Sequence, residues 1–376
     1  MSETRVSIYA VGDVGPRRED PDYPCKEPIF ALSAPITKEA DIAFCQLERI
    51  LSERPTPAYY WSVIHPDNVR QLTYGGFNVI SVAGNHHMDA GVEAFVDTLD
   101  VLKRNNIQPV GVGTNIAEAR TPVIVERKGT KVAFLGYSSI LPKSEIPYEA
   151  EANRPGCAPM FISTAYEASD WHPGTPSPKV ISMAHKEDLE AMKDDIRRAK
   201  AQADVVIMSI HWGIHHVPGL IAMYQYEVGH AAVDAGVDLI LGHHAHILKG
   251  IEVYKGKVIF YSLGNFAMDS PVTRSVSGRW DATFRPELDP KDFPYKYSAN
   301  DIHRKTCVAK CFISDRKINR VAFLPFMINE LGQPEPLSAE DKRSDEVYDH
   351  VVWSCQDQKL QTKFVREGND IVVVTE

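Results

Sequence analysis

The stretch VDLILGHHAH, residues 237–246, joins a mostly apolar segment to a glycine and three histidines. A short apolar segment that ends in glycine is typical of a buried strand whose carboxyl end opens into a tight turn. Histidine is the commonest metal ligand, and an extended turn lets alternate imidazoles point to one side. We therefore expect a strand over 237–241 followed by a metal-binding turn. The alternative is that one ring stacks on a neighbour and the others are solvated.

Polar side chains follow four other predicted strands in the same way. The strands are expected at residues 5–12, 41–48, 77–83 and 204–210, and Asp13, Glu48, Asn85 with His86, and His211 stand where their apolar segments stop. The carboxyl ends of strands in a layered α/β fold meet at one crevice, so we expect these side chains to gather with His244 and His246. Their mixed oxygen and nitrogen donors suit two adjacent divalent ions such as Zn, Mn, Fe or Co, rather than an all-oxygen Ca site.

Helical and further strand patterns alternate with these segments, which predicts an α/β protein. Helices are expected over 66–74, 90–104, 185–202, 221–235 and 338–360, with Asp89 as a cap of the second. Further strands are expected over 122–126, 131–137, 251–254, 258–261, 305–313, 320–326 and 371–374. We expect a single domain over 1–330 with long loops at about 138–181 and 267–304, and a C-terminal extension over 331–376 packed on it.

Composition and charge exclude several classes of protein. The 376 residues carry a net charge of −9, which argues against a nucleic-acid partner. The start of the chain lacks the pattern of a secretory signal, and no apolar segment is long enough to span a membrane, so we expect a cytoplasmic protein without a membrane partner. The six cysteines are scattered, and Cys307 and Cys311 are expected to be core thiols.

Six short motifs together resemble those of the poly-γ-glutamate capsule biosynthesis (CapA-type) family, a branch of the calcineurin-like metallophosphoesterase superfamily. In chain order they are Gly12-Asp13, QLE at 46–48, AGNHHMD at 83–89, HWG at 211–213, GHHAH at 242–246 and YSLGNF at 261–266. They cover roughly residues 5–267 in the order of the family. The resemblance implies a four-layer α-β-β-α sandwich of the metallophosphoesterase type, with a dinuclear metal centre between the sheets.

The resemblance also implies a role for each polar residue of these motifs. Asp13 and His246 would bind one metal ion; Asn85, His211 and His244 would bind the second; and Glu48 would bridge the two. His86 would be the acid that protonates the leaving group, and with His211 it forms the expected catalytic pair. His243 is the alternative ligand if the turn is shifted by one residue.

The chain departs from the superfamily and family patterns at three positions. The superfamily has Asp-x-His after its first strand, whereas the third position here is Gly15, and Glu48 stands where an Asp is usual. One metal ion therefore has fewer ligands and is expected to bind weakly or to keep an open coordination position. His215 stands where the family usually has Glu, and it could be an added ligand, a substrate contact or a solvated side chain.

The expected function is that of an intracellular metal-dependent hydrolase in which a metal-bound hydroxide attacks the substrate. Because the family is tied to γ-glutamyl polymers, we favour an amide or related C–N bond of a carboxylated small molecule or γ-glutamyl compound. His215 and one of Arg274, Arg279 and Arg285 would contact the substrate, the arginines as carboxylate clamps. The alternatives are a phosphodiesterase or phosphatase, and a non-catalytic accessory protein of poly-γ-glutamate synthesis. The sequence leaves a homo-oligomer open.

Overall fold

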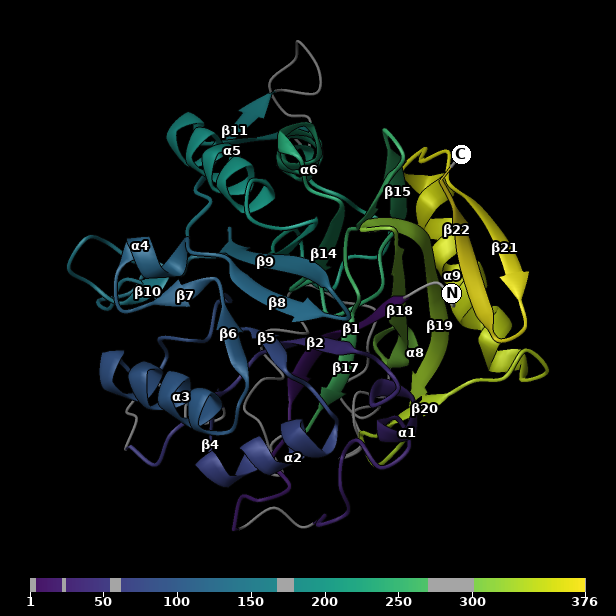
Figure 1. Ribbon diagram of the computed structural model, residues 1–376, viewed down its shortest axis with the longest axis horizontal. Helices are drawn as coiled ribbons and strands as arrows, with labels where there is room; N and C mark the ends of the chain where they lie inside the picture. The colour runs from purple at the N-terminus through teal and green to yellow at the C-terminus, as the bar shows by residue number, and fades with distance from the viewer. Residues whose placement is uncertain (1–4, 22–24, 55–61, 168–178, 270–300, 376) are drawn as a thin grey trace, which may run out of the picture.

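Two β-sheets packed face to face form the centre of the computed structural model (Figure 1), which describes residues 5–21, 25–54, 62–167, 179–269 and 301–375. The larger sheet has the order β21 (Lys363–Glu367), β22 (Asp370–Val374), β19 (Lys317–Ile328), β18 (Lys305–Ser314), β1 (Val6–Gly15), β2 (Ile42–Leu47), β5 (Val79–Ser81) and β6 (Gln108–Val110). Off this path, β17 (Asn265–Met268) pairs with β1, and β20 (Pro334–Pro336) pairs with β19.

The smaller sheet is built around the strand that the opening sequence motif predicts. Its order is β15 (Ile251–Tyr254), β16 (Lys257–Phe260), β14 (Leu239–His243), β13 (Val205–His211), β9 (Thr130–Ser138) and β8 (Val123–Arg127). Three two-stranded ribbons complete the strands: β3 (Ile50–Leu51) with β4 (Val63–Ile64), β7 (Val112–Gly113) with β10 (Gly156–Cys157), and β11 (Ile162–Glu167) with β12 (Lys179–Ala184).

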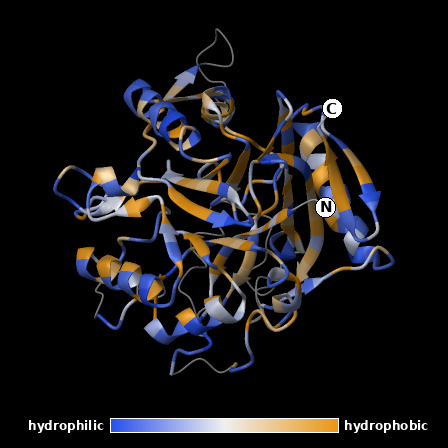
Figure 2. Cartoon of the chain, viewed as in Figure 1, coloured by the Kyte–Doolittle hydropathy of each residue, from blue (hydrophilic) through white to orange (hydrophobic). Residues whose placement is uncertain are grey.

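The helices are α1 (Ala34–Thr37), the 3-10 helix η2 (Pro66–Asn68), α2 (Val69–Tyr74), α3 (Val92–Arg104), α4 (Ile116–Ala119), α5 (Lys186–Lys200), α6 (Met223–Ala235), α8 (Asp301–Arg304) and α9 (Lys342–Asp357). Helix α3 packs on the outer face of the larger sheet, and α5 and α6 pack on the outer face of the smaller sheet, whereas α9 packs into the core between the sheets. In Figure 2 hydrophobic residues predominate on the central strands, whereas hydrophilic residues predominate on outer helices such as α5.

The four layers follow from the alternation of side chains along the strands. On β1, Ile8 points into the core between the sheets, and Tyr9 points into the outer core that α3 covers. On β13, Ile207 points between the sheets and Met208 points toward α5 and α6. Each layer therefore buries a face of its neighbour, which confirms the α-β-β-α sandwich.

The core between the sheets contains stacked aromatic rings and buried thiols. The rings of Phe44 on β2 and Phe134 on β9 stack with centroids 5.8 Å apart, so they join the two sheets directly. Cys307 and Cys311 are buried in the same core, which confirms that they are core thiols. Burial raises the pKa of the Cys307 thiol to about 12.

Most of the predicted helices and strands are present, but the segment 138–181 differs from expectation. It contains β10, β11 and the start of β12 rather than loop alone. Most residues of β11 are exposed. A strand with no buried face needs no alternation of apolar and polar residues, which is the pattern by which a strand is recognised in a sequence. Within the described part of the chain, no helix has both the length and the apolar character needed to cross a membrane.

Candidate metal centre

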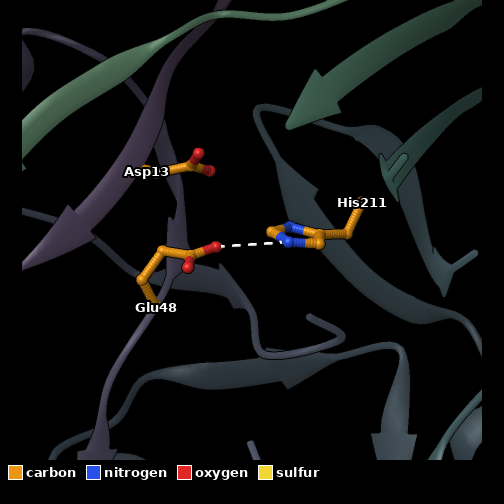
Figure 3. Close-up of side chains that lie close together, drawn as sticks. All are labelled: Asp13, Glu48 and His211. Atoms are coloured by element: carbon orange, nitrogen blue, oxygen red, sulfur yellow. Dashed lines mark ion pairs between the residues drawn. The ribbon is translucent and has the colours of Figure 1, made fainter. Parts of the chain in front are cut away.

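Side chains from both sheets meet where strands β1, β2 and β13 end. Asp13 near the end of β1, Glu48 directly after β2 and His211 at the end of β13 each place a ligand atom within 4.8 Å of the others (Figure 3). All three side chains are buried. Asp13 was expected just past its strand, but β1 continues to Gly15 because residues 13–15 pair with β17. The structure therefore brings together residues that the sequence separates by up to two hundred positions.

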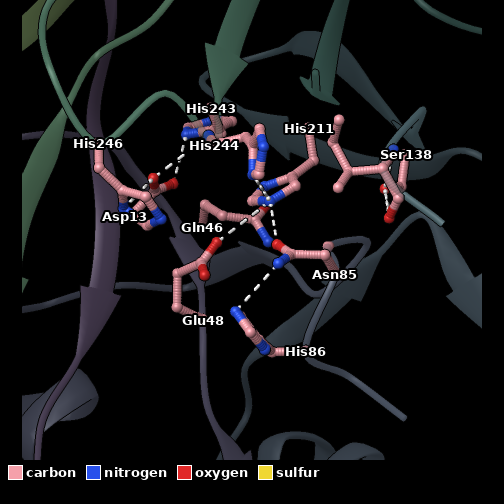
Figure 4. Close-up of polar contacts among 12 residues, drawn as sticks. Asp13, Gln46, Glu48, Asn85, His86, Ser138, His211, His243, His244 and His246 are labelled. Carbon is pink, nitrogen blue, oxygen red and sulfur yellow. Dashed lines mark hydrogen bonds and ion pairs between the residues drawn. The ribbon is translucent and has the colours of Figure 1, made fainter. Parts of the chain in front are cut away.

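One ring nitrogen, His211 Nε2, lies at the centre of this group (Figure 4). It is 2.7 Å from Asn85 Oδ1, 3.1 Å from His244 Nδ1 and 3.4 Å from Glu48 Oε1. A ring nitrogen carries at most one proton, so it cannot donate to all three of these atoms. Lone pairs that face one another at such distances are the arrangement expected around a shared cation.

A second group of donors surrounds the Asp13 carboxylate. His246 Nδ1 and His243 Nδ1 each lie 3.4 Å from one of its oxygens, and the His244 backbone N–H donates to Oδ2 at 3.2 Å. His246 Nδ1 also lies 2.8 Å from Asn265 Oδ1. Asn265 belongs to the YSLGNF motif, but its place beside His246 depends on the pairing of β17 with β1, which the sequence did not reveal.

Two buried carboxyl groups, those of Asp13 and Glu48, lie close together in the centre. Burial, together with the charge of Asp13, raises the pKa of Glu48 well above its usual range. Burial and the neighbouring imidazoles lower the pKa values of His211 and His244 well below theirs, so both rings favour the neutral form that ligates metals. A divalent cation would offset the carboxylate charge and use the imidazole lone pairs.

Buried polar atoms without a hydrogen-bond partner also indicate that the centre fits a metal ion. Within the described residues, Asp13 Oδ1, Glu48 Oε1 and both ring nitrogens of His243 are buried without a hydrogen-bond partner. Each such atom costs roughly 1–3 kcal/mol of folding free energy unless something else binds it. The donor set of carboxylate, amide and imidazole groups therefore fits a divalent metal ion, and His243 stays open as a ligand on the Asp13 side.

The turn that carries the histidines has an unusual backbone. His244 and His246 have φ values of 87° and 57°, a region that residues other than glycine seldom adopt. The turn is held in place by the His216 N–H, which donates to Ala245 O at 3.0 Å, and by the Leu263 N–H, which donates to Gly242 O at 3.0 Å. Left-handed residues cluster at functional sites, where the surroundings hold them.

Gly242, at the start of this turn, has no room for a side chain. A Cβ atom there would lie 2.3 Å from Tyr261 O and 2.6 Å from Trp212 Nε1. We expect Gly242→Ala to lower the free energy of unfolding by about 2 kcal/mol or more, measured by urea denaturation. The control is Gly229→Ala on α6, where the nearest atom is 3.4 Å from the added Cβ. A helical alanine at that position should leave stability unchanged or slightly raised. Equal stability of the two variants would contradict the prediction.

A histidine–aspartate pair lies beside the Asn85 ligand. His86 Nδ1 is 2.7 Å from Asp89 Oδ2, so it donates to that carboxylate, and the Tyr148 hydroxyl donates to the other oxygen. The Asn85 amide Nδ2 lies 3.0 Å from His86 Nε2. This pair of contacts points Asn85 Oδ1 toward His211.

The expected role of Asp89 as a helix cap is wrong. The N-cap of α3 is Gly91, which has no side chain to cap the helix, and the Asp89 carboxylate is occupied by His86 and Tyr148. Tyr148 comes from the segment 138–181, so its contact with Asp89 could not be foreseen from local sequence. The neighbouring His87 points into the core, where its ring nitrogens face the carbonyls of Gly84 and Tyr148.

Three more imidazoles form the rim of the centre, on the loop after β13 and on α8. The ring of His215 is exposed and lies 5.1 Å from that of His244. The ring of His216 is 5.4 Å from that of His246, and its Nδ1 lies 2.9 Å from His303 Nε2. His216 and His303 carry no role in the sequence prediction. The expected substrate contacts Arg274, Arg279 and Arg285 lie outside the described residues.

The chain is similar in sequence to proteins that are named for capsule and PGA biosynthesis. A family model described as "Bacterial capsule synthesis protein PGA_cap" matches residues 7–270. The "PGA biosynthesis protein CapA" of Bacillus subtilis is 30% identical over 296 residues, which are 74% of this chain and 70% of that protein. The "Capsule biosynthesis protein CapA" of Bacillus anthracis is 27% identical over 304 residues, 79% of this chain and 60% of that protein. A "Probable polyglutamine synthesis accessory protein" of Mycobacterium tuberculosis is 30% identical over 233 residues, 60% of this chain and 53% of that protein.

Proposed function

The chain belongs to the bacterial capsule synthesis protein family PGA_cap, and from this premise we propose that it is a metal-dependent hydrolase of a γ-glutamyl amide or a related carboxylated small molecule. The proposal rests on the surroundings of His211 Nε2. An amide oxygen, a carboxylate oxygen and an imidazole nitrogen each lie within 3.4 Å of this atom. A buried group of this kind fits a metal ion.

The proposed ligands divide into two halves that share a carboxylate. Asn85, His211 and His244 would hold one ion, Asp13 and His246 would hold a second, and Glu48 lies between the halves. The ions would be Zn, Mn, Fe or Co, because mixed oxygen and nitrogen donors suit these metals. When bound, one or two such ions would acidify a water molecule and withdraw electron density from the bond under attack.

The side chains around the metal ligands supply proton transfer and orientation. Asp89 keeps a proton on His86 Nδ1 and would stabilise the ring when Nε2 also carries one. We propose that His86 then gives the Nε2 proton to the leaving nitrogen. While His86 Nε2 is unprotonated, it accepts from the Asn85 amide and holds the amide oxygen toward the metal ligands; this contact is released when Nε2 takes up the proton that it transfers.

The substrate class rests on the relatives and on the mouth of the site. Relatives are named for capsule and PGA biosynthesis, so a γ-glutamyl compound is the proposed substrate. His215 lies at the mouth, beside the ring of His244, where an imidazole N–H could donate to a substrate carboxylate. One of Arg274, Arg279 and Arg285 is proposed to bind the same carboxylate, because guanidinium groups bind carboxylates in a bidentate manner.

Two chromogenic substrates test the proposal. Purified protein reconstituted with Mn²⁺ or Zn²⁺ should release p-nitroaniline from γ-glutamyl-p-nitroanilide, and EDTA treatment should abolish this release. Turnover of bis(p-nitrophenyl) phosphate alone would show that the bond is a phosphodiester instead. If neither substrate turns over and the protein co-purifies with a peptide ligase, the chain is an accessory protein and the proposal is wrong.

A further inference from the structure

A buried arginine fills the space beside Asp13 where a side chain at position 15 would lie. Gly15 is two residues along β1 from Asp13, and alternate residues of a strand face the same side. A Cβ atom at Gly15 would be 2.7 Å from Arg49 Nε, 2.8 Å from Arg49 Cγ and 3.0 Å from Met268 Sδ. Arg49 therefore occupies the space from which a side chain at position 15 could reach a metal ion bound by Asp13.

Arg49 is held in this place by contacts on both sides. It directly follows Glu48, it is 4% exposed, and its Nη2 donates to Asp269 O at 3.0 Å. The Asp269 carboxylate is itself bound by Arg18 Nε, at 2.9 Å and 3.0 Å, and by the Arg17 backbone N–H at 2.8 Å. The guanidinium cannot swing into solvent without breaking the contact with Asp269.

A fixed guanidinium next to a metal site changes the charge of that site. Arginine stays protonated at neutral pH, so Arg49 supplies a permanent positive charge beside Glu48. A positive charge in a buried region repels a divalent cation and partly neutralises the carboxylates that would attract one. The other half, with Asn85, His211 and His244, lies where β5, β13 and β14 end, and its donors apart from Glu48 are neutral.

We propose that Arg49 takes the place of a metal ligand beside Asp13, so that the protein binds one divalent ion tightly at the His211 half and a second ion only weakly at the Asp13 half. This inference rests on the proposed metal centre and goes beyond it, because it assigns the order in which the two halves fill and the residue responsible. Arg49 is a positioning and charge-setting residue in this account, without contact to substrate.

Manganese titration of the metal-free protein tests the inference without an activity assay. Room-temperature EPR measures free Mn²⁺, and the resulting isotherm gives the affinity of each site. In the wild type we expect a first ion bound tightly and a second bound at least about tenfold more weakly. Arg49→Met removes the charge and should tighten the second site by about tenfold or more. Arg49→Lys keeps the charge and should resemble the wild type, as should Arg54→Met, whose guanidinium pairs with Asp97 at the surface.

The Mn²⁺ isotherms distinguish a failure of this inference from a failure of the proposed metal centre. Two sites of equal affinity in the wild type would overturn the inference even if Arg49→Met does not fold, and they would leave the proposed metal centre standing. Identical isotherms for Arg49→Met and Arg49→Lys would also overturn it. A wild-type protein that binds no Mn²⁺ or Zn²⁺ at millimolar concentrations would overturn the metal centre, and this inference with it.

Discussion

Replacing His211 by alanine is expected to remove tight metal binding. His211 Nε2 lies within 3.4 Å of donor atoms of Asn85, His244 and the bridging Glu48, so its loss removes the neighbour that these three share. Groups that only orient a ligand change metal affinity by roughly 10- to 100-fold, and a direct ligand should change it by at least about 100-fold. Metal content after dialysis, together with the Mn²⁺ isotherm, measures the loss.

The matched control is His230→Ala, which removes an imidazole far from the centre. His230 lies on α6, where its Nε2 is 3.0 Å from both carboxylate oxygens of Glu252. We expect this variant to bind metal as the wild type does. Unchanged metal affinity in His211→Ala, with folding verified by circular dichroism, would mean that the ring is only a buried packing group. Hydrolysis should fall in parallel with metal content, because both depend on the same nitrogen.

Replacing His86 by alanine is expected to slow hydrolysis about 10²- to 10³-fold while the metal content stays close to that of the wild type. The expected change is in kcat, because the proposed proton transfer takes place at the leaving group. His86 also holds Asn85, so metal affinity should weaken slightly; the contact is a single hydrogen bond at 3.0 Å. An unchanged kcat in His86→Ala falsifies the role as acid.

Asp89→Asn removes the charge of the carboxylate but keeps the size of the side chain. The asparagine would keep the shape, but its NH₂ group cannot accept the His86 Nδ1 proton, and a tautomer change would follow. We therefore expect a loss of kcat that approaches that of His86→Ala, with normal metal content. Tyr148→Phe removes only the second hydrogen bond to Asp89 and should have a much smaller effect. A full loss in Tyr148→Phe would indicate that the loop around residue 148 is displaced.

The α/β class could be predicted because its signals are local, whereas the four-layer sandwich was predicted from the resemblance of six motifs to the CapA-type family. Apolar strands followed by a polar residue recur through the chain, and the alternation of Ile8 and Tyr9 or of Ile207 and Met208 gives each sheet two buried faces. The convergence of Asp13 and His211 followed from the general position of ligands at strand ends. The α/β class and the convergence of these residues could be inferred from the pattern of residues within single segments.

The contacts that the sequence did not predict all join distant segments. Tyr148 reaches Asp89, Asn265 reaches His246, and Arg49 fills the space beside Gly15. Each depends on how two loops or strands are placed relative to each other, which no local pattern encodes. Asp89 shows the difficulty well, since an acidic residue shortly before a helix is equally typical of a cap.

The proposed ligands come from separate sheets: Asp13 and Glu48 from the larger, His211 and His244 from the smaller. A cation bound between them would act as a crosslink whose strength depends on the concentration of free metal. Removing it would leave the buried carboxylate side chains of the larger sheet facing imidazole lone pairs of the smaller sheet, with no cation between them. The rigidity of the sandwich at that end would then be set by metal supply, whereas the core between the sheets would still be joined by the stack of Phe44 on Phe134.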